Sequence, residues 1–284
     1  MAIFRNQATL SYGGNVTTSN VVTGELQQAV SVTKYAVRDT YTQDEVLTYV
    51  ISLVNTGTTP LTDLTVTDDL GEYTAGGTTL VSLDYVAGSV NYYVDGVIQT
   101  PPAVTSTNPL TFTGINVPAG GNTFLVYEAR VNEFAPPVQG GTVTNTAVVT
   151  GTGLPASIQA SETVTAASEA FLTIGKSLSP TTVSDGDRLT YTFVIQNFGN
   201  TPVVATDNAT VTDTFDPILS ALTVTFNGAA WTEGVEYTYD ETTGVFATIP
   251  SAILVPAATY TQDPVTGAWS VIPGVSTLVV VGTV

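Results

Sequence analysis

The sequence contains only two lysines, Lys34 and Lys176, and both fall on the inward face of a predicted strand. The residues two places away on either side are aliphatic, so each ammonium group would stand in an apolar core, where an isolated charge is very costly. Asp68 and Asp213 alternate with apolar residues in the same way. Because burial disfavours the charged form of a lysine, we expect each lysine to lose its proton readily.

Two asparagines supply the third member of each set. Asn145 lies in phase with apolar neighbours, and Asn6 occupies the matching position near the N-terminus. A neutral amine can attack an asparagine carbonyl while a protonated carboxylic acid polarises it and transfers protons as ammonia leaves. The product is an isopeptide bond, and an unreacted ion pair hydrogen-bonded to asparagine is the alternative. The expected sets, with the aspartates as catalytic groups, are Lys34, Asp68 and Asn145 within one domain, and Lys176, Asp213 and Asn6 between two molecules.

The elements that carry these residues form an internal repeat. The sequence is rich in Val and Thr, and it holds 25 Gly and 15 Pro, a composition typical of short strands separated by tight turns. We find no long stretch with helical periodicity, so we predict an all-β chain of two tandem Ig-like β-sandwich domains. The repeated motifs are Lys34 and Lys176, Leu47–Tyr49 and Leu189–Tyr191, Asn55 and Asn197, and Val66–Asp68 and Val211–Asp213.

The second copy of the repeat is incomplete. The first copy continues into a strand at 143–149, whereas the second copy ends at Val284 without such a strand. A matching segment lies at the other end of the chain, because residues 4–10 resemble residues 143–149. The predicted parts are an N-terminal donor strand and extension at 1–23, a complete β-sandwich at 24–165, and a β-sandwich lacking its final strand at 166–284.

The orphan N-terminal strand predicts self-assembly. A sandwich that lacks a strand exposes unpaired backbone groups and an apolar groove. Val22 stands as far before Lys34 as Val164 stands before Lys176, so we expect the strand at the far end of domain one, where it enters the next molecule. The alternatives are a strand that folds back into its own second domain and an edge strand of domain one. The inward-facing residues of the donor strand are Phe4, Asn6, Ala8, Leu10 and Tyr12.

The order of these motifs resembles that of the bacterial surface-repeat family known as domain of unknown function eleven. The resemblance rests on the lysine motif, Leu-Thr-Tyr, Asn-x-Gly, Val-Thr-Asp and the terminal Thr-Asn-Thr-Ala, which the second copy meets only through the N-terminal segment. It implies Ig-like β-sandwiches on secreted, surface-attached proteins. The paired lysines and asparagines are also similar to those that staple the sandwich domains of Gram-positive pilins.

Composition limits the other functions. The net charge of −18 disfavours nucleic acid and anionic membranes as partners. Without cysteine or histidine, disulfides, thiol metal sites and the common catalytic triads are excluded, and we expect no enzyme activity, cofactor or metal site beyond weak calcium binding at the acidic surface. No apolar run could span a bilayer. No signal peptide is evident, so we expect either its prior removal or another export route, such as release around a spore.

We therefore expect the structural subunit of an extracellular filament on a bacterial cell or spore surface, with the chain itself as its main partner. The strands of one subunit would complete the next, and isopeptide bonds would give toughness without disulfides. The main alternative is a monomeric surface adhesin or a carbohydrate- or protein-binding module, which would bind an unknown surface ligand. The insertion at 260–273, absent from the first copy, is expected to form a protruding hairpin.

Overall fold

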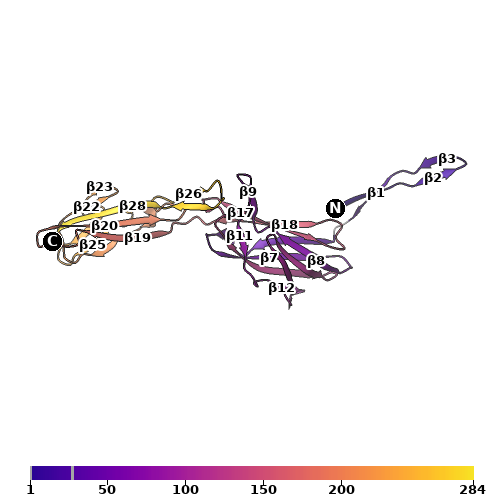
Figure 1. The fold of residues 1–284 in the computed structure, drawn as a ribbon, viewed down its shortest axis with the longest axis horizontal. Coiled ribbons are helices and arrows are strands. Elements are labelled where there is room, and N and C mark those ends of the chain that lie inside the picture. Colours follow the sequence, from indigo (N-terminus) through magenta and orange to yellow (C-terminus); the bar gives the residue numbers. More distant parts are fainter. Residues whose placement is uncertain (1, 27–28) are drawn as a thin grey trace. The chain divides into compact units, whose positions relative to one another are not determined.

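The computed structural model describes residues 2–26 and 29–284 and confirms the all-β sandwich class. The chain divides into two compact units. Unit 1 takes in the chain up to Asn132 together with Val143–Val164, and unit 2 takes in Glu133–Thr142 and Thr165–Val284. The described helical content is one 3-10 turn, η1 (Ala205–Asp207). Figure 1 labels strands of both units and colours them by their position in the sequence.

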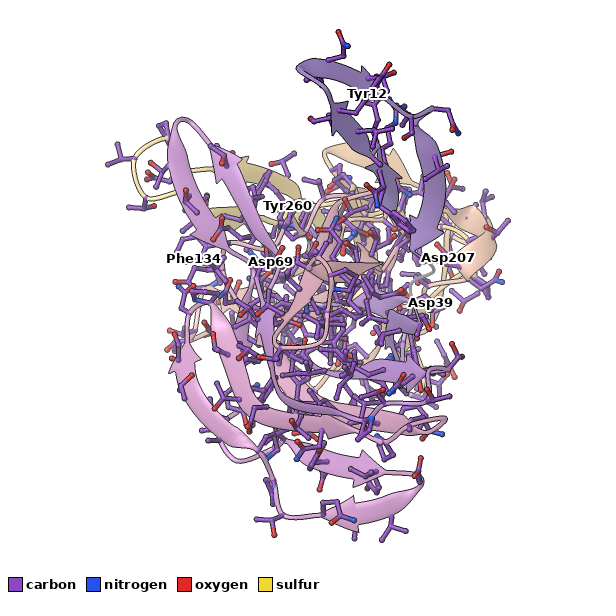
Figure 2. The ribbon with its side chains drawn as sticks, turned by 90° about the vertical axis from the view of Figure 1, so that its right-hand side faces the viewer. Tyr12, Asp39, Asp69, Phe134, Asp207 and Tyr260 are labelled. Carbon is purple, nitrogen blue, oxygen red and sulfur yellow. The ribbon has the colours of Figure 1, made fainter. Side chains whose placement is uncertain are left out.

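Residues 2–26, which we call the arm, form a two-stranded ribbon. β1 (Ala2–Asn6) pairs with β4 (Val22–Leu26), and β2 (Thr9–Tyr12) pairs with β3 (Asn15–Thr18), all antiparallel (Figure 1). Gly13 and Gly14 make the turn with φ of 50° and 83°, conformations that glycine adopts without strain. Tyr12, labelled in Figure 2, lies beside this turn and is exposed.

The prediction of one continuous strand from Phe4 to Tyr12 is wrong for the free chain. The strand is interrupted at Gln7 and Ala8, where Ser19 bonds both the backbone N–H and the backbone carbonyl of Ala8. The partner strand has one more residue than β1 and β2 across this break, so the ribbon contains a bulge. The arm is a hairpin and not the single edge strand of domain one that was the alternative.

Two six-stranded sheets form the sandwich of unit 1. The longest pair, β16 with β7, keeps an unbroken antiparallel register, and its alternate residues face a core in which Tyr49, Phe112 and Tyr127 are fully buried. A separate hairpin joins β9 (Glu72–Ala75) to β10 (Thr78–Val81). The first sheet runs β13 (Val97–Gln99), β12 (Asn91–Val94), β16 (Asn122–Val131), β7 (Val46–Asn55) and β5 (Val30–Ala36), with β11 (Leu83–Tyr85) also on β16. The second runs β14 (Ala103–Thr107), β15 (Leu110–Val117), β8 (Leu61–Asp68), β17 (Thr142–Thr150), β18 (Ile158–Ala166) and β6 (Thr40–Tyr41).

Unit 2 repeats the first of these sheets but only part of the second. Its core gathers Tyr191, Phe215 and Phe246, with Tyr191 stacked on Phe215. The predicted insertion forms the hairpin of β26 (Thr259–Gln262) and β27 (Trp269–Ile272). The larger sheet runs β19 (Leu172–Ser179), β20 (Arg188–Asn197), β28 (Gly274–Thr283), β22 (Ser220–Phe226) and β23 (Ala229–Trp231), and the smaller runs β21 (Thr212–Thr214), β25 (Val245–Thr248) and β24 (Tyr237–Asp240).

The smaller sheet of unit 2 ends where that of unit 1 continues. In unit 1, β8 lies between β15 and β17. Its counterpart β21 has β25 on one side, and across the described ranges no strand pairs with its other side. β21 is therefore an open edge of three residues, with backbone groups available to a further strand.

The Asn-x-Gly motif organises the end of one strand in each unit. In unit 2, Asn197 is fully buried, and its Oδ1 accepts hydrogen bonds from the backbone N–H of Phe171 and of Gly199. Its Nδ2 donates to the carbonyls of Thr201 and Pro256. One side chain therefore binds four backbone groups from three segments of the chain, which explains why this short motif recurs.

We expect Asn197→Ala to destabilise unit 2 strongly. A buried backbone group left without a partner costs about 1–3 kcal/mol, which applies to the buried N–H of Gly199, and the substitution also removes three part-buried hydrogen bonds. Calorimetric unfolding of the full chain measures the effect. Gln196→Ala is the matched control, since its side chain lies on the opposite face of β20 and is only half-buried. Equal losses for the two variants would contradict this role of Asn197.

Candidate functional site

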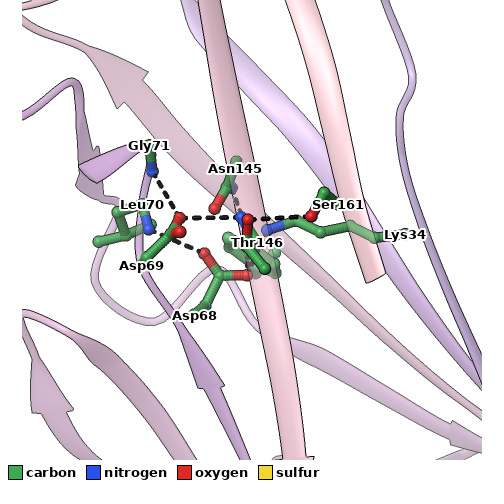
Figure 3. Close-up of polar contacts among 9 residues, drawn as sticks. Lys34, Asp68, Asp69, Leu70, Gly71, Asn145, Thr146 and Ser161 are labelled. Carbon is green, nitrogen blue, oxygen red and sulfur yellow. Dashed lines mark hydrogen bonds and ion pairs between the residues drawn. The ribbon is translucent and has the colours of Figure 1, made fainter. Parts of the chain in front are cut away.

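The residues of the predicted cluster of unit 1 meet in the buried core of the sandwich. Lys34 on β5 and Asp68 at the end of β8 face each other, with Nζ 2.5 Å from Oδ2 and both side chains fully buried. Asn145 on β17, also fully buried, lies in the same cluster, and Figure 3 shows its side chain and that of Lys34 directed toward Asp68. Three strands from both sheets thus bring an amine, a carboxyl group and a carboxamide together.

Tyr127 on β16 links these groups, and the sequence analysis missed it. Its hydroxyl donates to Asp68 Oδ2 at 2.7 Å and accepts from Asn145 Nδ2 at 3.1 Å. The Oδ1 atom of Asn145 is buried and has no hydrogen-bond partner among the described residues. The signal for Tyr127 was its inward position on a strand, in phase with buried Leu125 and Ala129. Tyrosine is a common core residue, so its inward position on the strand could not show that its hydroxyl belongs to the cluster.

Burial sets the electrostatics of the cluster. Desolvation lowers the pKa of Lys34, an effect that Asp68 partly opposes through its charge and its hydrogen bond. Desolvation also raises the pKa of Tyr127 well above its usual value, so this hydroxyl keeps its proton and donates. The other oxygen of Asp68 accepts from the backbone N–H of Leu70 at 3.1 Å, which fixes the carboxyl group. Burial thus favours the neutral amine of Lys34 over its ammonium form.

Asp69 does not join this cluster. Its Oδ1 accepts from the backbone N–H of Gly71 and of Thr146, at 3.0 and 2.8 Å, and so holds the end of β8 against β17 (Figure 3). Asp68 and Asp69 are adjacent on one strand, so their side chains point to opposite faces and make different contacts.

The cluster of unit 2 is open. Lys176 on β19 forms an ion pair with Asp213 on β21 and lies over the ring of Tyr191, 4.5 Å from its centroid. The side chain of Lys176 is 40% exposed, however, and that of Asp213 18%. The prediction of a core lysine is therefore wrong for this unit as it stands in one chain. Among the described strands, only β25 pairs with β21, so no strand on its other side covers the pair.

The same opening exposes the apolar face of β19. Val30 and Ala36 on β5 are each 7% exposed, whereas their counterparts Leu172 and Leu178 on β19 are 39% and 44% exposed. Burying a leucine or isoleucine side chain stabilises a protein by about 1.5–3 kcal/mol. A strand that covered this face would therefore add considerable stability. It extends along the strand that holds Lys176.

The third residue predicted for this second cluster, Asn6, lies on β1 of the arm, opposite Val22 of β4. The other predicted donor residues Phe4, Leu10 and Tyr12 are each more than half exposed, and Ala8 is exposed as well. The arm thus presents several apolar side chains to solvent.

We expect Asp68→Asn to cost unit 1 far more stability than Asp213→Asn costs unit 2. The first change leaves a fully buried lysine without its charge partner, which destabilises a protein by about 3–5 kcal/mol. The second leaves Lys176 in contact with water, where loss of an ion pair costs about 1 kcal/mol or less. Denaturant unfolding of the two full-length variants measures both losses, and equal losses would contradict the different burial of the two pairs.

No protein-family model matches the chain, and no curated protein matches it significantly, so membership of the surface-repeat family named above stays a prediction. Several solved structures are similar at low identity. They include the pilus backbone protein RrgB of Streptococcus pneumoniae, at 13% identity over 86% of this chain and 55% of that one, with a TM-score of 0.34. The BcpA major pilin subunit of Bacillus cereus is 14% identical over 96% of this chain and 73% of that one, with a TM-score of 0.33.

A collagen-binding domain from a Staphylococcus aureus adhesin is 9% identical over 49% of this chain and 99% of that one, with a TM-score of 0.31. At such TM-scores the superpositions carry no argument about function. Among the described residues no helix is long and apolar enough to cross a membrane, and no group of three or more acidic residues is arranged to hold a metal ion.

Proposed function

We propose that this protein is the structural subunit of an extracellular bacterial filament, in which the arm of one molecule completes unit 2 of the next. The observation that carries the proposal is the open edge of β21. It lies beside an exposed lysine–aspartate pair, in a chain whose arm resembles the strand that fills the same place in unit 1. Addition of a strand to such an edge is a known mode of protein recognition.

The order of the chain favours a second molecule as the recipient. In unit 1, β18 completes the sandwich and then leads through a short tether into the next unit along the chain, which begins with β19. Val22 of the arm stands as far before Lys34 of β5 as Val164 of β18 stands before Lys176 of β19, so by the same relation the arm completes a unit that precedes unit 1. The molecule's own unit 2 follows unit 1 in the chain. The contact is therefore head to tail, and it repeats without closing.

Unit 1 also supplies the register of the proposed junction. Ala147 and Val149 of β17 stand opposite Asp68 and Val66 of β8. If Asn6 takes the place of Asn145, then Ala8 stands opposite Asp213 and Leu10 stands opposite Val211. Backbone pairing would then extend β21 beyond its present three residues, and Asn6 would enter the cluster of Lys176 and Asp213.

The same geometry supports a covalent cross-link in unit 1. The Lys34 ammonium gives a proton to Asp68, and the neutral Nζ attacks Asn145 Cγ to form a new N–C bond. Asp68 returns a proton to Asn145 Nδ2 and takes one from Nζ, the Cγ–Nδ2 bond breaks, and ammonia leaves. The product is a neutral amide between β5 and β17. It removes a buried charge and links the two sheets without cysteine.

Lys176 and Asn6 would react in the same way at the junction, with Asp213 as the proton carrier. The hydroxyl of Tyr127 has no equivalent there, because the corresponding residue of β28 is Val280. The carboxamide of Asn6 would therefore react at the junction without the hydrogen bond that Tyr127 makes to Asn145 in unit 1. Covalent bonds inside and between subunits would make the filament resistant to denaturants.

The unit 1 cross-link predicts a mass defect. The folded chain should be lighter than its sequence by one ammonia after denaturation, and Asn145→Ala should restore the full mass of that variant's sequence. Asn116→Ala is the control, because Asn116 lies on the exposed surface away from the cluster and should leave the mass defect intact. Intact-mass spectrometry reads this directly, and a wild-type chain at full sequence mass would contradict the bond.

Filament formation should depend on the inward face of the arm. Leu10 corresponds to Val149, which is fully buried, whereas Ser11 corresponds to Thr150, which is exposed. Leu10→Asp would bury a carboxylate at the junction and should abolish filaments, while Ser11→Asp should leave them intact. Electron microscopy and sedimentation of the two variants measure this. Filaments from Leu10→Asp in wild-type amounts would refute the donor role of the arm.

A further inference from the structure

The hydroxyl of Tyr127 connects the carboxyl group of Asp68 with the carboxamide of Asn145. It donates to Asp68 Oδ2 at 2.7 Å and accepts from Asn145 Nδ2 at 3.1 Å. Among the described residues, no hydrogen bond runs directly from Asp68 to Asn145, and the second oxygen of Asp68 accepts from the backbone N–H of Leu70. A proton that passes from this acid to the amide nitrogen therefore meets the tyrosine hydroxyl on its way.

The ring of Tyr127 is packed on several sides, so the position of its hydroxyl is fixed. Tyr127 stands opposite Tyr49 in the β16–β7 pair, and the two rings are stacked with their centroids 5.7 Å apart. Phe112 and Tyr85 also contact the ring, with centroids at 5.7 and 6.4 Å. Desolvation raises the pKa of Tyr127, so the hydroxyl keeps a proton to donate. A hydroxyl has one donor and two acceptor lone pairs, and it can therefore give one proton while it takes another.

We propose that Tyr127 is a further catalytic residue of the unit 1 cross-link, in which its hydroxyl relays a proton from Asp68 to the leaving nitrogen of Asn145. The proposal rests on the cross-linking reaction proposed above. Once Nζ of Lys34 has bonded to Asn145 Cγ, Nδ2 carries a free lone pair and takes the hydroxyl proton of Tyr127. The tyrosine takes the proton of Asp68 in the same step and ends unchanged. Asp68 then takes a proton from Nζ, the electron pair on Oδ1 re-forms the carbonyl, the Cγ–Nδ2 bond breaks, and ammonia leaves.

The cluster of unit 2 has no residue that could act as this relay. In unit 1 Tyr127 stands opposite Tyr49, whereas in unit 2 Val280 stands opposite Tyr191. Val280 is fully buried and has no proton to donate. An asparagine that enters this cluster from a second copy would have to receive its proton from Asp213 directly. The bond within unit 1 should therefore form much faster than the bond at the junction, so that a new filament is first held together without covalent bonds.

Removal of a single hydroxyl tests the relay in unit 1. Tyr127→Phe keeps the ring and its stacking. Tyr49→Phe is the matched control, since the Tyr49 hydroxyl is also buried but has no hydrogen-bond partner in the part of the chain that the structure describes. Full-length chains made by cell-free synthesis are sampled into denaturant at intervals and weighed by intact-mass spectrometry. Tyr127→Phe should slow the loss of ammonia by about a hundredfold, an effect typical of general acid–base catalysis, and Tyr49→Phe should react at the wild-type rate.

The outcomes separate the relay from the reaction that it serves. If Tyr127→Phe loses ammonia as fast as the wild type does, the relay is refuted and the cross-link stands. If the wild-type chain keeps its full mass, the proposed cross-linking reaction fails and the relay fails with it. Circular dichroism of each variant checks that it is folded.

A second readout leaves unit 1 unchanged and adds the hydroxyl to unit 2. Val280→Tyr places a phenol opposite Tyr191, and Val280→Phe is the control that adds the ring without the hydroxyl. In assembling filaments, Val280→Tyr should join Lys176 to Asn6 of a second copy at least about tenfold faster than Val280→Phe does. Denaturing gels of samples taken over time measure this rate as the growth of a ladder of subunit multiples. Equal rates for the two variants would contradict a relay through the hydroxyl.

Discussion

The backbone groups along the free edge of β21 need partners, and the apolar side chains of β19 need cover. This single requirement accounts for the other unusual features of the chain. It explains why Lys176 is exposed while Lys34 is buried, although both occupy the same place in the repeat. It also gives a reason for an N-terminal hairpin whose side chains face solvent. In this account a strand donated by the arm pairs with the free edge of β21, covers the apolar face of β19 and encloses Lys176.

The two units present one chemical cluster in two states. In unit 1, β17 belongs to the same chain and supplies the carboxamide. The amine, the carboxyl group and the carboxamide are therefore joined by hydrogen bonds through Tyr127. In unit 2 the amine and carboxyl group form an ion pair that solvent reaches. A buried charge pair adds little net stability by itself. Formation of a neutral amide between the lysine and the asparagine would replace this buried charge pair with a covalent bond between strands.

Much of this organisation was readable in the sequence, and the reasons are physical. The alternation of side chains along each strand placed Lys34, Asp68 and Asn145 on inward faces. Comparison of the two copies of the repeat then predicted that they share one core. Parity could not identify Tyr127, because a core tyrosine looks the same whether or not its hydroxyl binds a neighbour. Repeat matching revealed the missing strand at 143–149, whereas the sheet order was needed to show that no described strand of unit 2 takes the place of β18. The bulge at Ala8 depends on a local contact with Ser19, which alternation of side chains does not encode.

The central claim is that Asn6 of one molecule enters the cluster of Lys176 and Asp213 in another. Two batches of protein, one with ordinary and one with isotopically heavy nitrogen, are mixed before assembly, digested, and analysed for cross-linked peptides by mass spectrometry. The account predicts a peptide containing Lys176 joined to one containing Asn6, lighter by one ammonia, with half of the pairs carrying mixed labels. Cross-links with matched labels only would mean that each chain completes itself, and the absence of any Lys176–Asn6 peptide from assembled material would contradict the covalent junction.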